Sequence, residues 1–372
     1  MPTVLAAGAF GQRNPGDEAL LSALLAGLPG WRVIATSADP RATAAAHGCQ
    51  AVRARNPAAI ARAVSRSDAV VVAGGTVFKS LHPGTRRWRS ALLRNALALM
   101  AAARAMGKQR AMIGVGADSL SAPLARRLAR EIVRHADLTI LRDEESARCL
   151  ADAGVPPPFR IGADPVWTLL DRPPRSPRDA RAVVVALSWL AGGSEIDALL
   201  VAALRRVTET GVPVHVQPWQ VNGGREDDLE RARALVGRLG ANAAPIPAPG
   251  SLADARELFG RYRAVVGLRF HSLVAAASAE VPFVAIAHEP ELAALARRMH
   301  QADVSSRDDP GRLAAAVLDA IEGPTPSQAA VRAEIARAEE GRRLLRVLLS
   351  RGRSPDANDV TGLPLWPADW VP

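Results

Sequence analysis

Strand-like and helix-like segments alternate along most of the 372-residue chain. Short apolar runs, typical of buried strands, are each followed by a longer Ala/Leu/Arg-rich stretch with helical spacing. The expected strands are residues 3–7, 32–36, 50–53, 69–73, 111–115, 138–141, 160–163, 182–187, 212–216, 264–267 and 283–287. The expected helices are residues 17–25, 57–65, 89–106, 123–135, 144–153, 195–210, 225–239, 251–259, 273–279 and 290–299. This alternation predicts βαβ units and parallel sheets covered by helices on both faces.

A charged segment with three prolines, residues 171–179, interrupts the alternation and predicts a stiff linker. We expect an N-terminal Rossmann-like lobe over residues 1–171 and a C-terminal one over residues 180–325. Residues 326–350 predict a terminal helix, and residues 351–372 an extended tail that covers the body or is partly disordered. Because ligands bind beyond the carboxyl ends of parallel strands, two such lobes predict a binding cleft between them.

Composition excludes several classes of protein. The formal charge is +10, but the basic residues are spread along the chain and only one tyrosine is present, which disfavours a nucleic-acid partner. The two cysteines, Cys49 and Cys149, form neither a disulfide framework nor a metal motif, and no His/Asp/Glu set has zinc spacing. The start lacks a signal-peptide pattern, and no apolar run is long enough for a transmembrane segment. We therefore expect a cytoplasmic protein without a metal; a homo-oligomer is left open.

The stretch Gly267-Leu268-Arg269-Phe270-His271-Ser272 follows an apolar strand pattern and precedes an apolar helix pattern. Arg269 is a cation, His271 can transfer a proton, and Ser272 is a candidate N-cap residue. A helix N-terminus already favours anions, so this turn suits a phosphorylated or carboxylated substrate. The plainer alternative is a solvated arginine beside a structural histidine.

The first strand is followed by a loop with three glycines and two carboxylates, Asp17 and Glu18, ahead of a helix. The loop is neither a dinucleotide fingerprint nor a P-loop. Its glycines allow backbone to approach a ligand, and Asp17 or Glu18 could bind sugar hydroxyls or act as a general base. Alternatively, the two acids only complement the helix dipole.

Other candidates also follow predicted strands. Gly74 and Gly75 allow a close backbone approach or form a tight turn. Arg142 precedes Asp143, a good N-cap residue, and is expected to lie at the ligand-binding edge of the sheet. His288 and Glu289 follow the strand after the Arg269 turn and could position a substrate; alternatively, Glu289 and Glu291 are ordinary acids at a helix N-terminus. His47, His82, His135, His215 and His300 stand alone and are interpreted as structural or solvated.

Taken in order, these loops resemble the polysaccharide pyruvyl transferase family over residues 4–300. The matching pieces are Gly11-x-x-Asn14-x-Gly16-Asp17-Glu18, Gly74-Gly75, Gly114-x-Gly116, Arg142-Asp143-x-x-Ser146, Ala163-Asp164-Pro165 and Gly267-Leu268-Arg269-Phe270-His271-Ser272. The resemblance implies two Rossmann-like lobes similar to GT-B glycosyltransferases. It also implies transfer of a pyruvyl group from phosphoenolpyruvate, the donor substrate, onto a sugar or glycan as a ketal, with no further cofactor.

The resemblance assigns roles to the candidate residues. Arg269 and His271 would be catalytic and contact phosphoenolpyruvate on the second lobe. The acceptor sugar would lie on the first lobe near Asn14, Asp17 and Gly75. The remaining substrate-binding candidates are Gly16, Glu18, Gly74, Arg142, Ser272, His288 and Glu289.

The chain departs from the family pattern after the strand that follows the Arg269 turn. Where family members commonly read Tyr-Asp-Pro-Lys, this sequence reads His288-Glu289-Pro290-Glu291. An acid in place of the lysine would repel a trianionic donor by about 1 kcal/mol or more at close range. Either His288 supplies the missing cation, or the donor differs, or the activity is lost. The alternatives are therefore a GT-B-type glycosyltransferase with a nucleotide-sugar donor and a non-catalytic sugar-binding relative.

Overall fold

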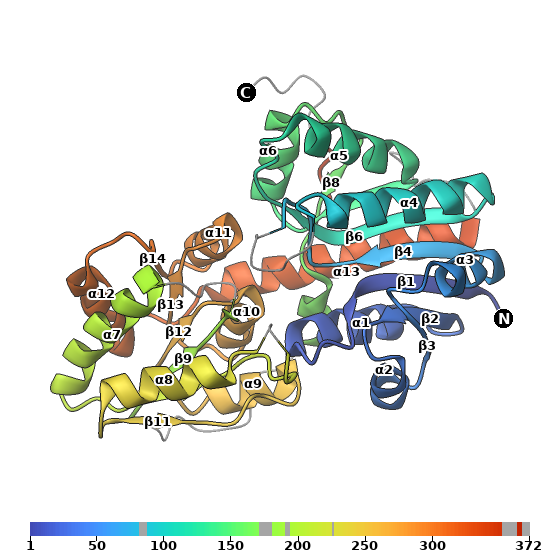
Figure 1. Cartoon of the computed structure of the whole chain (residues 1–372). Helices are drawn as coiled ribbons and strands as arrows, with labels where there is room; N and C mark the ends of the chain where they lie inside the picture. The colour runs from blue at the N-terminus through green and yellow to red at the C-terminus, as the bar shows by residue number, and fades with distance from the viewer. Residues whose placement is uncertain (82–87, 171–180, 190–193, 225–226, 352–362, 367–372) are drawn as a thin grey trace. The chain divides into compact units, whose positions relative to one another are not determined.

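The computed structural model describes the whole chain except residues 82–87, 171–180, 190–193, 225–226, 352–362 and 367–372 (Figure 1). The chain divides into two compact units. Unit 1 comprises Met1–Gln12, Asp17–Leu169 and Glu334–Pro372, and unit 2 comprises Arg13–Gly16 and Leu170–Ala333. The expected linker, residues 171–179, lies outside the described residues, as does Trp370 of the expected tail.

Unit 1 is built on an eight-stranded parallel sheet. Its strands are β1 (Thr3–Phe10), β2 (Arg32–Ser37), β3 (Gln50–Arg53), β4 (Ala69–Ala73), β5 (Thr76–Phe78), β6 (Gln109–Ala117), β7 (Leu138–Leu141) and β8 (Arg160–Ile161). They lie in the order β3-β2-β1-β4-β6-β7-β8, with β5 paired to β6. The helices are α1 (Pro15–Gly27), α2 (Pro40–His47), α3 (Pro57–Arg66), α4 (Ala91–Ala105), α5 (Pro123–His135) and α6 (Glu144–Asp152), followed by a 3₁₀ helix at Pro165–Leu169.

Unit 2 repeats the plan with six parallel strands in the order β11-β10-β9-β12-β13-β14. The strands are β9 (Val183–Ala186), β10 (Val214–Gln217), β11 (Ala243–Pro245), β12 (Ala264–Gly267), β13 (Phe283–Ile286) and β14 (Ala302–Val304). The helices are α7 (Ser194–Glu209), α8 (Leu229–Leu239), α9 (Leu252–Phe259), α10 (Phe270–Ser278), α11 (Pro290–Arg298) and α12 (Pro310–Glu322). The last helix, α13 (Gln328–Arg351), begins in unit 2 and continues into unit 1.

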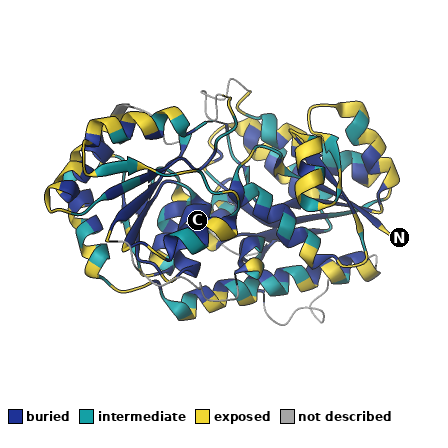
Figure 2. Cartoon of the chain, turned by 90° about the horizontal axis from the view of Figure 1, so that it is seen from below, coloured by how far each residue is buried: buried dark blue, intermediate teal, exposed yellow. Residues whose placement is uncertain are grey.

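Both sheets form because their central strands are apolar on both faces. Every residue of β4, β9 and β12 is buried, as parallel strands covered by helices require. Figure 2 shows the buried strands at the centre of each unit and the exposed helix faces outside. The predicted fold class, α/β with two parallel Rossmann-like sheets, is confirmed.

In each sheet the strand order reverses direction beside the first strand, between β1 and β4 and between β9 and β12. Ligands of open α/β sheets bind at the carboxyl ends of strands at such a switch point.

Several elements differ from the expectation. The sequence patterns missed β5, β11 and β14, which are only three residues long. They also missed α2 and α12, each of which begins with an Asp-Pro pair whose aspartate caps the helix. In sequence such a pair resembles a turn. The helix expected from residue 225 begins at Leu229, and the helix expected from residue 273 begins at Phe270.

The described part of the tail packs on unit 1. Leu365 forms an antiparallel bridge with Arg160, and the Trp366 ring stacks on Phe159 with ring centroids 6.3 Å apart. Leu363 is buried. Residues 363–366 therefore cover the body of this unit, one of the two arrangements expected for the tail. Within the described residues, no helix combines the length and apolar character needed to cross a membrane.

Candidate functional site

The turn that carries Arg269 and His271 lies at the switch point of the unit 2 sheet. It follows β12, which pairs with β9 on one side and β13 on the other. Arg269 is itself the N-cap residue of α10, and His271 lies in the first turn of that helix. The expectation that Ser272 caps the helix is wrong, because the helix begins two residues before it. The buried Ser272 hydroxyl instead donates to the carbonyl of Arg269 at 2.7 Å and tightens the turn.

A buried carboxylate from another loop holds the Arg269 side chain. Asp228, at the start of α8, is fully buried, and its Oδ2 lies 3.3 Å from Arg269 Nη2. The same oxygen accepts the backbone N–H groups of Trp219 at 3.1 Å and Gln220 at 2.8 Å. Gln220 Oε1 also accepts from Arg269 Nη2 at 3.3 Å. The guanidinium is thereby fixed in one orientation.

The electrostatics of this pair are those of a buried ion pair. Burial raises the pKa of Asp228 above its ordinary value, while the Arg269 charge and the Gln220 N–H lower it. All three donors converge on Oδ2, and Oδ1 is buried with no hydrogen-bond partner among the described residues. Arg269 Nε is likewise buried with no hydrogen-bond partner among the described residues. A cation so fixed, with donor capacity left over, can bind an anion at the N-terminus of α10.

The first loop of the chain contributes to unit 2 through Asn14 and Gly16. Asn14 Oδ1 accepts from Trp219 Nε1 at 3.2 Å and from the Gly16 N–H at 3.1 Å. Gly16 in turn packs directly on His271, since a Cβ at this position would lie 2.1 Å from His271 Nδ1. Asn14 was expected on the acceptor side, in the first lobe. Its contacts place it instead in unit 2, where it holds the backbone that packs on the imidazole.

His288 and Glu289 follow β13, the next strand of the sheet. His288 Nδ1 donates to the Ile286 carbonyl at 3.0 Å. Burial lowers the pKa of His288, Glu289 opposes this shift, and the charge on Arg269 adds to it. This direction favours the neutral form of the imidazole in the absence of a ligand. This disfavours the idea that His288 supplies the cation that the family pattern places at position 291.

In unit 1, the glycine pair follows β4 at the switch point. Gly74 has φ of +60° and packs on Leu20, since a Cβ at this position would lie 2.3 Å from Leu20 Cδ2. Gly75 has φ of +70°, and the space around it is open. Its carbonyl accepts the N–H groups of Val77 and Gly116. Of the two, Gly75 is therefore the one that leaves room for a ligand against the backbone.

Glu18, expected to bind substrate, has both carboxylate oxygens engaged within unit 1. Oε1 accepts the Gly11 N–H at 2.7 Å, and Oε2 pairs with His47 Nε2 at 2.9 Å. His47 Nδ1 lies 3.3 Å from the Ser22 hydroxyl, so His47 is a structural histidine, one of the two interpretations made from the sequence. These contacts fix the first loop. Asp17 lies beside Glu18 in the first turn of α1 and is half-buried.

Arg142 is almost completely buried, with its Nε 3.3 Å from Asp143 Oδ2 and its Nη2 3.5 Å from the Thr76 hydroxyl. Asp143 caps α6 as expected, accepting from the Ser146 N–H at 2.7 Å. Gly116 leaves the space that the guanidinium occupies, since a Cβ there would lie 2.4 Å from Arg142 Nη2. Arg142, in the turn after β7, thus lies against Thr76 at the start of β5 and Gly116 near the end of β6.

The predicted site residues thus fall into two sets. Unit 2 brings together Asn14, Gly16, Arg269, His271 and Ser272, with His288 and Glu289 on the next loop. Unit 1 holds Asp17, Glu18, Gly74, Gly75 and Arg142. Three further residues of the site, Trp219, Gln220 and Asp228, were not predicted from the sequence. The signal that could have found them is the loop after β10, which carries Gln220, Asn222 and four charged residues at 225–228.

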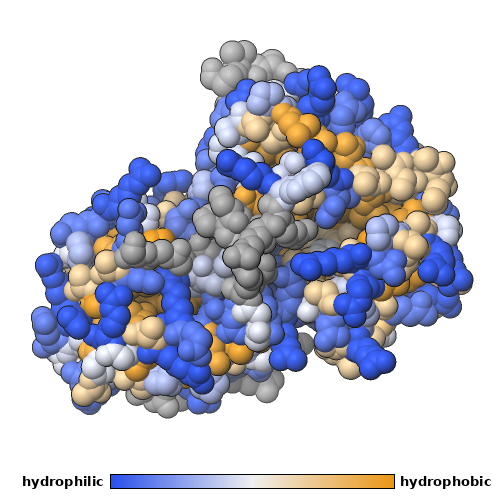
Figure 3. All heavy atoms as spheres, viewed as in Figure 1, coloured by the Kyte–Doolittle hydropathy of each residue, from blue (hydrophilic) through white to orange (hydrophobic). Residues whose placement is uncertain are grey.

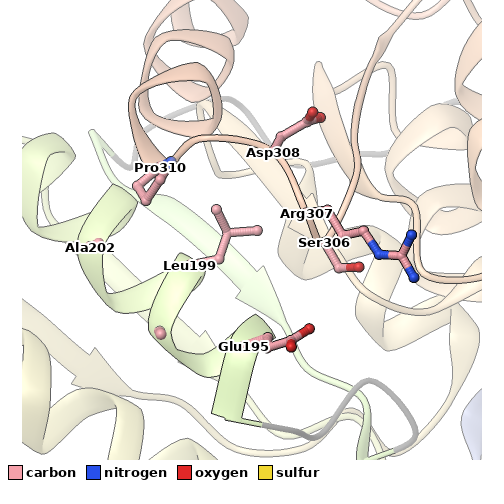
Figure 4. A pocket seen from close by; sticks show the side chains of 8 residues that line it. Glu195, Leu199, Ala202, Ser306, Arg307, Asp308 and Pro310 are labelled. Atoms are coloured by element: carbon pink, nitrogen blue, oxygen red, sulfur yellow. The ribbon is translucent and has the colours of Figure 1, made fainter.

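Outside these two sets, the described residues contain a pocket but no candidate metal centre. No group of three or more His, Cys, Asp or Glu among them could hold a metal ion. The pocket, of about 490 Å³, lies between the start of α7 and the loop before α12 (Figure 4). Glu195 and Leu199 line it from α7, and Ser306, Arg307 and Asp308 from the loop. None of the predicted site residues lines this pocket.

Solved structures share the fold across nearly the whole chain. A UDP-bound MnaA from S. aureus has a TM-score of 0.63 at 11% identity, covering 95% of this chain and 99% of its own. A putative UDP-N-acetylglucosamine 2-epimerase from Listeria monocytogenes gives 0.64 at 13%, with 95% and 97% covered. Alr3699/HepE from Anabaena, in complex with UDP and glucose, gives 0.59 at 14%, with 95% and 96% covered. At these identities the likeness shows a GT-B-like fold alone. No curated protein matches the chain significantly.

The family comparison is more specific than the fold. The polysaccharide pyruvyl transferase family matches residues 14–290, from Asn14 to the start of α11. This range includes the glycine pair after β4 in unit 1, and Arg269 and His271 at the switch point of unit 2. The match extends over well more than half of the 372 residues, and the chain is therefore a transferase that belongs to the polysaccharide pyruvyl transferase family.

Proposed function

We propose that the protein transfers a pyruvyl group from phosphoenolpyruvate to two hydroxyls of a sugar or glycan, forming a ketal and releasing phosphate. The observation that carries the proposal is the position of Arg269 and His271 at the N-terminus of α10, at the switch point of the unit 2 sheet. Phosphoenolpyruvate carries a carboxylate and a phosphate, which need a fixed cation and N–H donors. Arg269, oriented by Asp228, and the first turn of α10 supply both.

Ketal formation from phosphoenolpyruvate requires one proton transfer to carbon. A proton adds to the CH₂ carbon of the enol, which becomes the methyl group of the ketal. The two acceptor oxygens attack the neighbouring carbon, and the C–O bond to phosphate breaks. One hydroxyl proton replaces the proton used on carbon, and the other leaves on the phosphate. His271 is suited to donate the carbon-bound proton or to bind the phosphate.

Acids close to the donor distinguish this site. Asp228 pairs with Arg269. The negative charges of Glu289 and Glu291 are close enough to His288 to raise its pKa, against the larger lowering by burial. We therefore expect weak donor binding, because each carboxylate opposes a trianion. The likeness to UDP-bound structures shows the fold alone and does not favour the glycosyltransferase alternative.

Donor binding tests the proposal. We expect calorimetry to detect phosphoenolpyruvate at millimolar concentration or below, and phosphate to be released when a suitable sugar is added. Arg269→Ala is expected to weaken donor binding at least about tenfold, since a charge-assisted contact is lost. Arg263→Ala, on a half-exposed surface pair with Glu322, is the matched control. Stabilisation by UDP but not by phosphoenolpyruvate in a thermal-shift assay would replace this proposal with the nucleotide-sugar alternative.

Gly16→Ala tests whether the packing on His271 matters for the reaction. The new methyl group would overlap His271 Nδ1 and displace the imidazole, so we expect kcat to fall at least about tenfold. Gly237→Ala in α8 is the control, because a Cβ there meets nothing within 4 Å. Equal kinetics for the two variants would show that His271 tolerates displacement and is not a precisely placed catalytic group.

A further inference from the structure

The formal charge of the chain is concentrated in one seventh of its length. Residues 85–135 hold eleven Lys and Arg but only two Asp and Glu, so this segment carries +9 of the total of +10. No acidic residue occurs between Asp68 and Asp118. The basic residues themselves are spread along the chain, as expected, but the acidic residues that neutralise them elsewhere are missing here. Arg86 and Arg87 of this segment lie outside the described residues.

Six of the nine basic residues that the structure describes in this segment lie on the helix pair α4 and α5, whereas Arg110 lies in β6 and pairs with Asp137. These two helices pack against each other, and Arg104 Nη1 at the end of α4 donates to the Arg134 carbonyl at the end of α5. Arg127, Arg130 and Arg134 follow one another at spacings of three and four residues, opposite the buried face of α5, and all are exposed. The exposed side chains of residues 88–134, on and beside these two helices, are called the basic face below; the buried strand β6 within this range is not part of it.

Arginines on other helices have acidic neighbours at helical spacing. On α13, Arg337, Arg342 and Arg343 each pair with a glutamate three residues earlier. On the basic face, Arg134 has one such partner, Glu131, while Arg130 donates only to the Gly154 carbonyl in the contacts seen. A general bias toward arginine would raise the arginine content of both helices equally. It therefore does not explain why most arginines of α5 lack the acidic neighbours that those of α13 have.

The same face exposes large apolar side chains. Trp88 is 71% exposed, Leu124 46% and Met106 44%, and these are three of the six large hydrophobic residues exposed among the described residues. The Arg94 guanidinium lies 4.9 Å from the Trp88 ring centroid, which pairs a cation with an aromatic ring at the surface. Figure 3 shows hydrophobic surface bordered by hydrophilic side chains where α4 and α5 lie in Figure 1.

We propose that the basic face binds the surface of a membrane rich in anionic phospholipid. Basic side chains are attracted to anionic headgroups, and tryptophan and leucine insert at the headgroup boundary, so the two signals act together. The exposed apolar residues favour a bilayer over a nucleic acid, because single-strand readers stack several bases on aromatic side chains and this face has one. The surface itself does not depend on the donor. Its consequence, access to lipid-linked sugar acceptors, rests on the proposed transferase function.

Vesicle flotation tests this inference with the full-length protein. We expect binding to phosphatidylcholine vesicles with 30% phosphatidylglycerol, at least about tenfold weaker binding to phosphatidylcholine alone, and release at high salt. The triple variant Arg127→Glu, Arg130→Glu, Arg134→Glu should lower binding at least about tenfold. The double variant Trp88→Ser, Leu124→Ser should lower it about fivefold, with circular dichroism unchanged.

A matched control changes the net charge by the same amount as the α5 triple variant, but in unit 2. Arg233→Glu, Arg263→Glu, Arg312→Glu reverses three exposed arginines of unit 2, and its binding should stay within about twofold of wild type. Equal loss in both triple variants would overturn the inference in favour of net charge alone. Absence of binding to anionic vesicles, or displacement of the vesicles by polyuridylate at lower concentration, would also overturn it. So would a dimer by light scattering that Trp88→Ser, Leu124→Ser dissociates, because the face would then be an interface between copies.

Discussion

His271→Ala is expected to lower kcat at least about a hundredfold. Proton transfer by a placed side chain typically contributes this much, and His271 is the histidine in the first turn of α10, packed on Gly16. Its side chain is 8% exposed, so water does not easily take its place. The measurement is the steady-state release of phosphate with saturating phosphoenolpyruvate and sugar acceptor.

The binding constant of the donor separates the two roles open to His271. An unchanged constant with a reduced kcat assigns proton donation, whereas a parallel loss of donor affinity assigns phosphate binding. His300→Asn is the control, because His300 is exposed and has φ of +56°, a conformation that asparagine tolerates. If His271→Ala keeps more than a tenth of the activity, His271 has no part in the chemical step.

The sequence was sufficient to place the Arg269 turn, because the placement follows from local pattern. The apolar run before Gly267 and the helical pattern after it determine a strand, a turn and a helix, whatever the rest of the chain does. The same holds for Asp143 at the start of α6. Strand alternation then put these turns at the carboxyl edge of a parallel sheet, which is a property of βαβ units in general.

Contacts between distant segments could not be predicted in this way. Asn14 and Trp219 are 205 residues apart, and nothing in either loop specifies the other. Asp228 lay inside a stretch that resembled one long helix, because the acids and arginines around it have helical spacing. Only the fold shows that the backbone N–H groups of Trp219 and Gln220 surround its carboxylate before α8 begins.

Asp228→Ala is expected to lower the free energy of unfolding of unit 2 by about 3–5 kcal/mol. The substitution leaves the largely buried Arg269 guanidinium without its ion-pair partner and two backbone N–H groups without an acceptor. For a unit of this size such a loss corresponds to a fall of roughly 6–20 °C in melting temperature. Calorimetric scans at pH 7 in the absence of donor provide the measurement.

Asp228→Asn shows whether charge or hydrogen bonding is responsible. The amide oxygen can take the place of Oδ2 and accept the same three donors, while the NH₂ group takes the place of Oδ1, which has no hydrogen-bond partner among the described residues. We therefore expect this variant to lie within about 1 kcal/mol of wild type at pH 7. A loss as large as that of Asp228→Ala would mean that the negative charge itself is essential to the fold.

The pH dependence of this pair of proteins provides a second, independent measurement. Burial raises the pKa of Asp228 in the folded state above its ordinary value of 3.8, so the folded state binds the proton more tightly than the unfolded state. As the pH falls through the raised pKa toward 3.8, wild type should gain stability relative to Asp228→Asn, which has no titrating group at this position. Above the raised pKa the difference should be constant. A relative loss of wild-type stability on acidification would show instead that the Arg269 ion pair outweighs burial and that Asp228 stabilises unit 2 through its charge.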